Sequence, residues 1–281
     1  MTSRLALPAL ALALALTGCD ATGDTSTPAT SSDVSDAAAT IASAVALDGG
    51  GALDDAASVA ALTTASADKA ARLDDRPGCT GERVFDEGTS TWLSTLSCER
   101  GNPEGLFYHA FSRSTTHRFL DEAGEPLPGP EGAAAVEFSI VDGEGEHLTP
   151  RASYELDDLG ANLDVVRLGD GNVSVDGIYE REGVRTFFGR GEAEREVDYA
   201  LSLDLDEVTG PAGRRDRWAG AVSGSVSGVY TATVTATGPG GETNVREVER
   251  TFTVTFPVEG RARIAIGGRT FDVNTSTGEV L

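Results

Sequence analysis

Histidine is the side chain here best suited to bind a metal or transfer a proton, and the chain holds only three, His109, His117 and His147. His109 and His117 are eight residues apart, so on one continuous strand they would share a face. The aromatic residues predicted on that face are Phe107, Phe111 and Phe119. A metal site needs more ligands at shorter spacing, no His-Glu-x-x-His motif is present, and His147 stands in a turn-like Gly-Glu-Gly-Glu context. We therefore expect packed or surface histidines, with no metal and no cofactor.

Carboxylates are abundant, with 45 Asp and Glu against 22 Lys and Arg, for a net charge of −23. Chance pairs are therefore common, and no glycosidase-like acid pair can be selected. The segment 170–177 resembles a calcium loop but has Val175 where the loop needs Gly and Arg181 where it needs Glu, so we predict a hairpin there. The acidic groups at 157–158 and 204–207 remain open as weak calcium ligands.

Other catalytic and binding motifs are missing from the sequence. The segment Gly224-Ser225-Val226-Ser227-Gly228 lacks the Gly-x-Ser-x-Gly spacing of a nucleophile elbow, and no phosphate-binding glycine loop occurs. The acidic excess argues against a nucleic-acid partner, which needs Lys and Arg opposite its phosphates. We accordingly predict no catalytic residues.

The N-terminus carries the clearest functional signal. Residues 5–16 are nearly all Leu and Ala, too short to span a membrane but suited to a signal peptide. The run ends in Leu16-Thr17-Gly18-Cys19, which resembles the lipobox of bacterial lipoproteins. That resemblance implies cleavage after residue 18, lipidation of Cys19, and a location in the cell envelope, membrane-anchored by lipid and facing the periplasm or the exterior. It covers residues 1–19 alone.

The other two cysteines suggest a structural bridge. Cys79 and Cys98 flank a candidate hairpin whose turn is Asp86-Glu87-Gly88. Export would place both thiols in an oxidising compartment, and they lack the Cys-x-x-Cys spacing of a reactive pair. We predict a disulfide that joins two neighbouring strands.

Composition divides the chain into four parts. We expect a signal peptide at 1–18, a flexible tether at 19–36, an Ala-rich helical segment at 37–76 and a β domain at 77–281. The helical segment should contain two stretches, 36–47 and 52–73, because glycines at 49–51 interrupt it. All aromatic residues follow residue 84, so the core belongs to the β domain.

The β domain shows alternation of apolar and polar residues with period two. The clearest stretches are 197–205, 217–236 and 247–256, and Gly-rich turns at 169–172, 238–241 and 267–268 separate them from their neighbours. About twelve strands fit between residues 82 and 275. The fold class is therefore all-β, a large antiparallel meander that forms a sandwich or a curved open barrel, with the 52–73 helix as a candidate cover.

Three functions remain open. The leading hypothesis is a lipid-anchored envelope lipoprotein with a non-catalytic binding or structural accessory role. Its partners would be the membrane, through Cys19, and a lipid-like or envelope-component ligand. The second is a carrier whose curved sheet holds a lipid-like ligand under a helical lid, which needs a cavity of several hundred Å³. The third is a glycan-active enzyme with an acid pair not yet identified.

Overall fold

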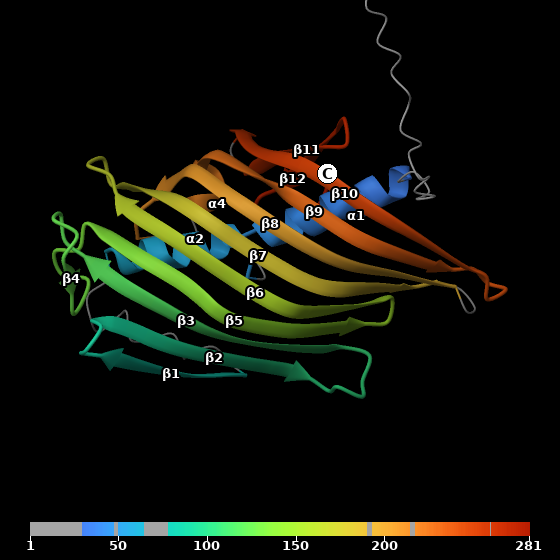
Figure 1. Ribbon diagram of the computed structural model, residues 1–281, viewed down its shortest axis with the longest axis horizontal. Coiled ribbons are helices and arrows are strands. Elements are labelled where there is room, and N and C mark those ends of the chain that lie inside the picture. Colours follow the sequence, from blue (N-terminus) through green and yellow to red (C-terminus); the bar gives the residue numbers. More distant parts are fainter. Residues whose placement is uncertain (1–29, 48–49, 65–77, 190–192, 214–216, 259) are drawn as a thin grey trace, which may run out of the picture.

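The computed structural model describes residues 30–47, 50–64, 78–189, 193–213, 217–258 and 260–281. Within these ranges, one antiparallel meander of twelve strands curves around two helices (Figure 1). The helices are α1 (Ser31–Val45) and α2 (Ala52–Leu62), with a short turn α4 (Trp218–Ala221) between two strands. The strands are β1 (Cys79–Asp86), β2 (Thr91–Gly101), β3 (Tyr108–Leu120), β4 (Pro126–Leu127), β5 (Ala135–Thr149), β6 (Ala152–Arg167), β7 (Asn172–Phe188), β8 (Glu194–Pro211), β9 (Ser223–Thr237), β10 (Thr243–Val258), β11 (Arg261–Ile266) and β12 (Arg269–Asn274).

Every strand pairs with its sequence neighbours, except that β4 pairs only with β3, so that β3 continues directly to β5. The sheet is open, with β1 at one edge and β12 at the other (Figure 1). The all-β meander predicted from alternation is confirmed, as are the turns at 169–172, 238–241 and 267–268. Register shifts interrupt five of the strand pairs, including β6–β7 near Asp158 and β8–β9 near Glu207. Such bulges increase the local twist, which helps a long sheet to curve.

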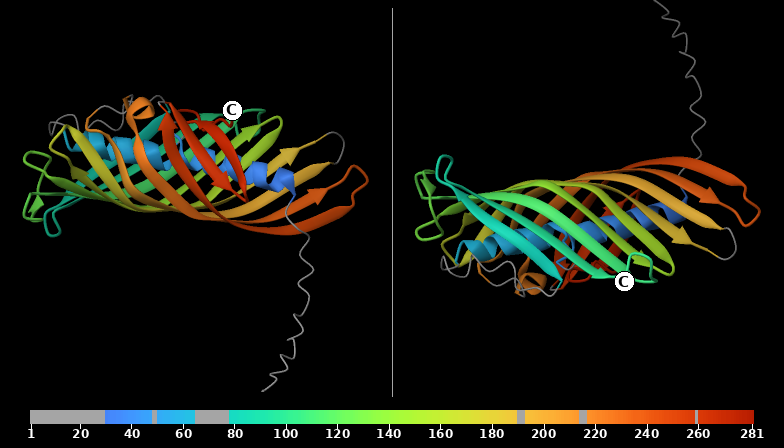
Figure 2. Two further views of the ribbon diagram at one scale, coloured as in Figure 1. Left: turned by 90° about the horizontal axis from the view of Figure 1, so that it is seen from above. Right: turned by 90° about the horizontal axis from the view of Figure 1, so that it is seen from below.

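Both helices lie along the concave face of the sheet, as the two views in Figure 2 show. Their small residues are almost completely buried: Ala37, Ala38 and Ala44 of α1 and Ala56, Ala57 and Ala60 of α2 are each 0% exposed. Short Ala-rich helices of this length are marginal in water, so their stability must come from packing. The helices fill the curve of the sheet and belong to the core.

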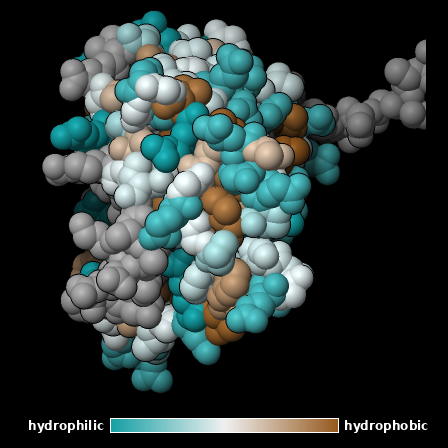
Figure 3. Space-filling model, turned by 90° about the vertical axis from the view of Figure 1, so that its left-hand side faces the viewer, coloured by the Kyte–Doolittle hydropathy of each residue, from teal (hydrophilic) through white to brown (hydrophobic). Residues whose placement is uncertain are grey.

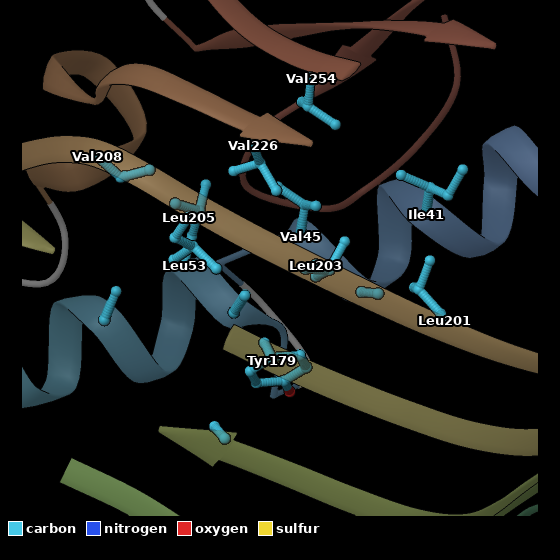
Figure 4. Close-up of a cluster of buried hydrophobic side chains, with 14 of the residues drawn as sticks. Ile41, Val45, Leu53, Tyr179, Leu201, Leu203, Leu205, Val208, Val226 and Val254 are labelled. Carbon is cyan, nitrogen blue, oxygen red and sulfur yellow. The ribbon is translucent and has the colours of Figure 1, made fainter. Parts of the chain in front are cut away.

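The centre of the core joins the two helices to β7, β8, β9 and β10. The residues in contact there are apolar, and ten of them are labelled in Figure 4: Ile41, Val45, Leu53, Tyr179, Leu201, Leu203, Leu205, Val208, Val226 and Val254. Tyr179 also donates a hydrogen bond from its hydroxyl to the backbone carbonyl of Gly50, at 2.8 Å. This bond ties the connection between the helices to the middle of the sheet.

Helix bounds differ from the composition-based expectation. α1 begins at Ser31, inside the segment expected as tether, because Thr30 and Asp33 form a capping box that starts the helix there. α2 ends at Leu62, earlier than residue 73, and residues 65–77 lie outside the described ranges. The 52–73 helix alone was expected to cover the sheet, but both α1 and α2 pack against it.

The predicted start of the strand over 217–236 was wrong. Trp218 lies in the helical turn α4, and β9 begins only at Ser223. The Trp218 ring is fully buried and donates a hydrogen bond to the carbonyl of Pro211, at 2.9 Å. It packs against Gly210, where a Cβ atom would lie 2.6 Å from the ring. The absence of a side chain at Gly210 therefore makes room for this ring.

Candidate functional site

The predicted lipidation residue, Cys19, lies outside the described residues. Within them, none of the helices is long and apolar enough to cross a membrane.

Cys79 and Cys98 form a disulfide, as the hairpin spacing predicted. The two residues are direct register partners of β1 and β2, with Cα atoms 3.9 Å apart. The bridge therefore closes the first hairpin at its open end. It has a structural role in that hairpin.

His117 is buried in the face of β3 that was predicted for it, where its ring lies parallel to that of Trp92 and perpendicular to that of Phe119. Its Nε2 contacts a guanidinium nitrogen of Arg83. Burial, together with the charge of Arg83, lowers the pKa of His117 to about 3. The ring is therefore neutral at ordinary pH and packs against Trp92 and Arg83 of the β1–β2 hairpin. Phe107, expected on the same face, instead precedes β3 and is 66% exposed.

Ion pairs connect the N-terminal end of α1 to the sheet. The Asp33 carboxylate is fully buried and lies 2.8 Å from Arg195 on β8 and 3.0 Å from Arg246 on β10. Burial alone would raise the pKa of Asp33, but hydrogen bonds from Arg246 and Thr30 outweigh it and lower that pKa to about 2. Asp33 is therefore ionised at neutral pH and holds α1 to two strands.

A second ion pair holds α2 to the other side of the sheet. The Asp55 carboxylate, 1% exposed, accepts a hydrogen bond from Arg113 of β3. Burial opposes the charge of Arg113, but the neighbouring Asp55 more than offsets this and raises the pKa of the guanidinium. Asp33 of α1 and Asp55 of α2 are thus both buried carboxylates that pair with arginine from the sheet.

The candidate functional site is a pocket of about 100 Å³ beside α1, on the part of the concave face that the helices leave uncovered. The sheet contributes basic, aromatic and acidic side chains from β3, β5, β6, β7 and β8, and α1 contributes hydroxyls. Among its lining residues are His109, Phe111, His147, Tyr154, Arg181, Arg185 and Tyr199 from the strands, with the carboxylates Glu146 and Glu155, and with Thr40 and Ser43 from the helix. We call this the arginine pocket.

Two guanidinium groups define its chemistry. Arg185 lies over the rings of Tyr154 and Phe187, with its central carbon 4.8 and 5.3 Å from their centroids, and donates a hydrogen bond to the Thr40 hydroxyl at 2.6 Å. Arg181 lies four residues earlier on the same face of β7. Among the described residues, the buried Nε atoms of both arginines have no hydrogen-bond partner. Guanidinium groups held against aromatic rings are well suited to bind a carboxylate or a phosphate.

His109 and His147 form the rim of the arginine pocket. They are register partners of β3 and β5, with ring centroids 5.7 Å apart. Burial lowers the pKa of His109, and the nearby His147 and Arg100 add to that effect. His147 was expected in a turn, and that expectation was wrong because β5 continues to Thr149. The two rings add polar nitrogens beside the guanidinium groups.

A second groove, of about 350 Å³, lies on the outer face over β2, β3, β5 and β6. Its lining includes five carboxylates, those of Glu99, Glu144, Glu146, Glu155 and Asp157. Nevertheless, throughout the described ranges no three His, Cys, Asp or Glu side chains come together in a way that could hold a metal ion. The acidic groups at 157–158 and 204–207 lie at strand positions next to bulges.

Sequence reasoning missed the arginine pocket because its residues come from five strands and a helix. The alternation Tyr179, Arg181, Gly183, Arg185 and Phe187 places two arginines on the buried face of one strand, and this was the available signal. Pairing of His109 with His147 requires the register between β3 and β5, which a single sequence does not give.

No protein-family model matches the chain, and comparisons with curated proteins and with solved structures find no match either.

Proposed function

We propose that this chain is a lipid-anchored protein of the bacterial cell envelope that binds a small anionic ligand in the arginine pocket without chemically changing it. The lipobox ending in Cys19 supports the anchor, and the two guanidinium groups beside aromatic rings support the ligand class. The single observation that carries the binding proposal is the pair of buried, unpartnered Nε atoms of Arg181 and Arg185.

The size of the pocket limits the ligand. A volume of about 100 Å³ is below the roughly 150 Å³ of an engineered cavity that holds benzene, but the pocket opens toward solvent at its histidine rim. It suits a carboxylate or phosphate that carries one ring or a short acyl group. The anionic group would lie between Arg181 and Arg185, and the apolar part would lie against Phe111, Tyr154 and Tyr199.

Binding of phenyl phosphate, measured by calorimetry, tests this proposal. Replacement of Arg185 by Gln removes one charged donor, worth about 1.5 to 3 kcal/mol, so the dissociation constant should rise by roughly tenfold or more. The matched control is Arg263→Gln, because Arg263 is half exposed and pairs with Asp272 outside the pocket, 2.9 Å away. Equal affinity in the parent protein and in Arg185→Gln would contradict the proposed site.

A second candidate is the carrier of a lipid-like ligand, with α1 and α2 as its lid. It is favoured by the position of the helices on the concave face, where they are held by small apolar residues and by the ion pairs of Asp33 and Asp55. A long acyl chain would need several hundred Å³, so the helices would have to leave the sheet. Native mass spectrometry with lipid extraction on Cys19→Ser protein, purified gently from its own envelope, tests this candidate. A bound acyl compound would support it, and a bare mass would contradict it.

A further inference from the structure

The end of the molecule from which α1 emerges carries exposed apolar side chains. The connections β2–β3, β5–β6, β7–β8 and β9–β10 all lie at this end, together with the first turn of α1 (Figures 1 and 2). We call it the anchor end, because Cys19 precedes α1. The two most exposed large apolar residues of the described chain, Leu106 at 69% and Phe107 at 66%, are neighbours in the β2–β3 connection. Phe188, at 44%, ends β7 at the same end.

At the opposite end, Figure 3 shows hydrophilic and hydrophobic residues intermixed. Its exposed apolar side chains include Val84 beside the β1–β2 turn, at 50%, and Val166 and Leu168 beside the β6–β7 turn, at 43% and 39%, each less exposed than Leu106 and Phe107. A loop with two adjacent and largely exposed apolar side chains is unusual for a surface that faces only water.

We propose that the anchor end lies on the phospholipid bilayer that holds the Cys19 acyl chains, with Leu106 and Phe107 inserted at the membrane–water interface. This inference rests on the proposed lipid anchor. Ten residues lie between Cys19 and Thr30, so these two residues are at most roughly 40 Å apart at full extension, which keeps the anchor end within that distance of the membrane. Such tethering makes even a weak contact effective, because it raises the local concentration of the bilayer near the loop.

The charge at the anchor end is consistent with an apolar contact. This end carries both signs: Arg100 at the end of β2 and Glu104 in the β2–β3 connection, Arg151 in the β5–β6 connection, and Glu242 in the β9–β10 connection. A basic patch that would require anionic lipid is therefore not part of the contact. We expect the contact between the anchor end and the bilayer to form on zwitterionic phosphatidylcholine. It should resist added salt, since burial of apolar surface drives it.

Fluorescence quenching by brominated phosphatidylcholine tests the orientation. The lipidated full chain carrying Phe107→Trp is reconstituted in vesicles with and without brominated acyl chains. The matched control is Leu168→Trp at the opposite end, and the parent protein supplies the signal of the native Trp92 and Trp218, which lie away from the anchor end. The expected result is loss of emission from the residue-107 tryptophan in brominated vesicles, with no loss for the residue-168 control.

Flotation of the same vesicles distinguishes failure of the proposed orientation from failure of the proposed lipid anchor. Protein that floats but shows no quenching at position 107 would overturn the orientation and leave the lipid anchor standing. Protein that does not float would overturn the anchor, and the orientation with it. Equal quenching at positions 107 and 168 would also contradict a defined anchor end.

Discussion

Along β8, alternate side chains from Val197 to Leu205 are buried beneath the two helices, whereas no residue of β1 is buried. Both strands belong to one continuous sheet and show similar alternation of exposure. The difference lies in what covers them, because the main contacts of α1 and α2 are with β6 to β9 and with β11, whereas the β1–β2 hairpin forms one edge of the sheet. The hairpin relies on the Cys79–Cys98 disulfide and on the packing around His117.

The covered and the uncovered part of this sheet are therefore stabilised in two different ways. In the covered part, apolar burial supplies the stability, and Ala-rich helices serve because small residues allow close approach to a curved sheet. In the uncovered part, a covalent bond and an aromatic cluster replace the missing core. The arginine pocket lies between the two parts, where helix cover ends and the concave face becomes accessible.

The largest expected effect is loss of core packing between helix and sheet. Leu53→Ala removes a fully buried side chain of α2 and should lower the free energy of unfolding by about 2 to 5 kcal/mol. The matched control in the uncovered part is Val84→Ala in β1, which is 50% exposed and should cost less than about 0.5 kcal/mol. Urea unfolding followed by circular dichroism measures both. Equal losses would remove the distinction between the two parts.

Removal of the disulfide should act on the other part. The double variant Cys79→Ser, Cys98→Ser loses a constraint worth about 3 kcal/mol for a loop of about 20 residues. We expect faster hydrogen exchange in β1 and β2, with β6 to β9 unchanged. Cys19→Ser is the control, since it removes a cysteine outside the described body. Uniformly faster exchange across the whole sheet would contradict independent support of the hairpin.

Acid should weaken the attachment of α1. The pKa of Asp33 is about 2 in the folded chain, below its ordinary value of 3.8, so its ionised form stabilises the fold above that value. This stabilisation, roughly 2 kcal/mol by linkage, is lost as the pH falls from about 4 toward 2. Asp33→Asn should lack this part of the pH dependence, as measured by urea unfolding at several pH values. A control replacement of the half-exposed Asp272 should leave it in place.

A further prediction concerns the ionisation of a single histidine. His117 should stay neutral until the pH approaches 3, because its burial penalises the charged ring. Its folded pKa lies below the ordinary 6.5, so its contribution to stability is complete above that value and declines as the pH falls toward 3. NMR titration of the three histidines measures this directly. Titration of His117 near pH 6.5 would show that the ring is not buried as described.

Much of the fold was predictable because turn chemistry and alternation are local. The turn at 238–241 and the alternation of 197–205 each depend on a few adjacent residues. The start of α1 was missed because Thr30 and Asp33 stand in a Ser- and Thr-rich segment typical of a tether. Trp218 continued the alternation although it belongs to a helical turn. The arginine pocket was out of reach, since it depends on register across five strands and on the position of α1.

Hydrogen exchange of the full chain, measured by mass spectrometry at neutral pH, tests most directly whether the N-terminal helices are part of the core. We predict that amides of α1 and α2 exchange about as slowly as those of β6 to β9, because the same buried contacts hold both. Rapid exchange over residues 31–62 with a protected sheet would contradict this account. It would show that the helices leave the concave face, and it would turn attention to the carrier.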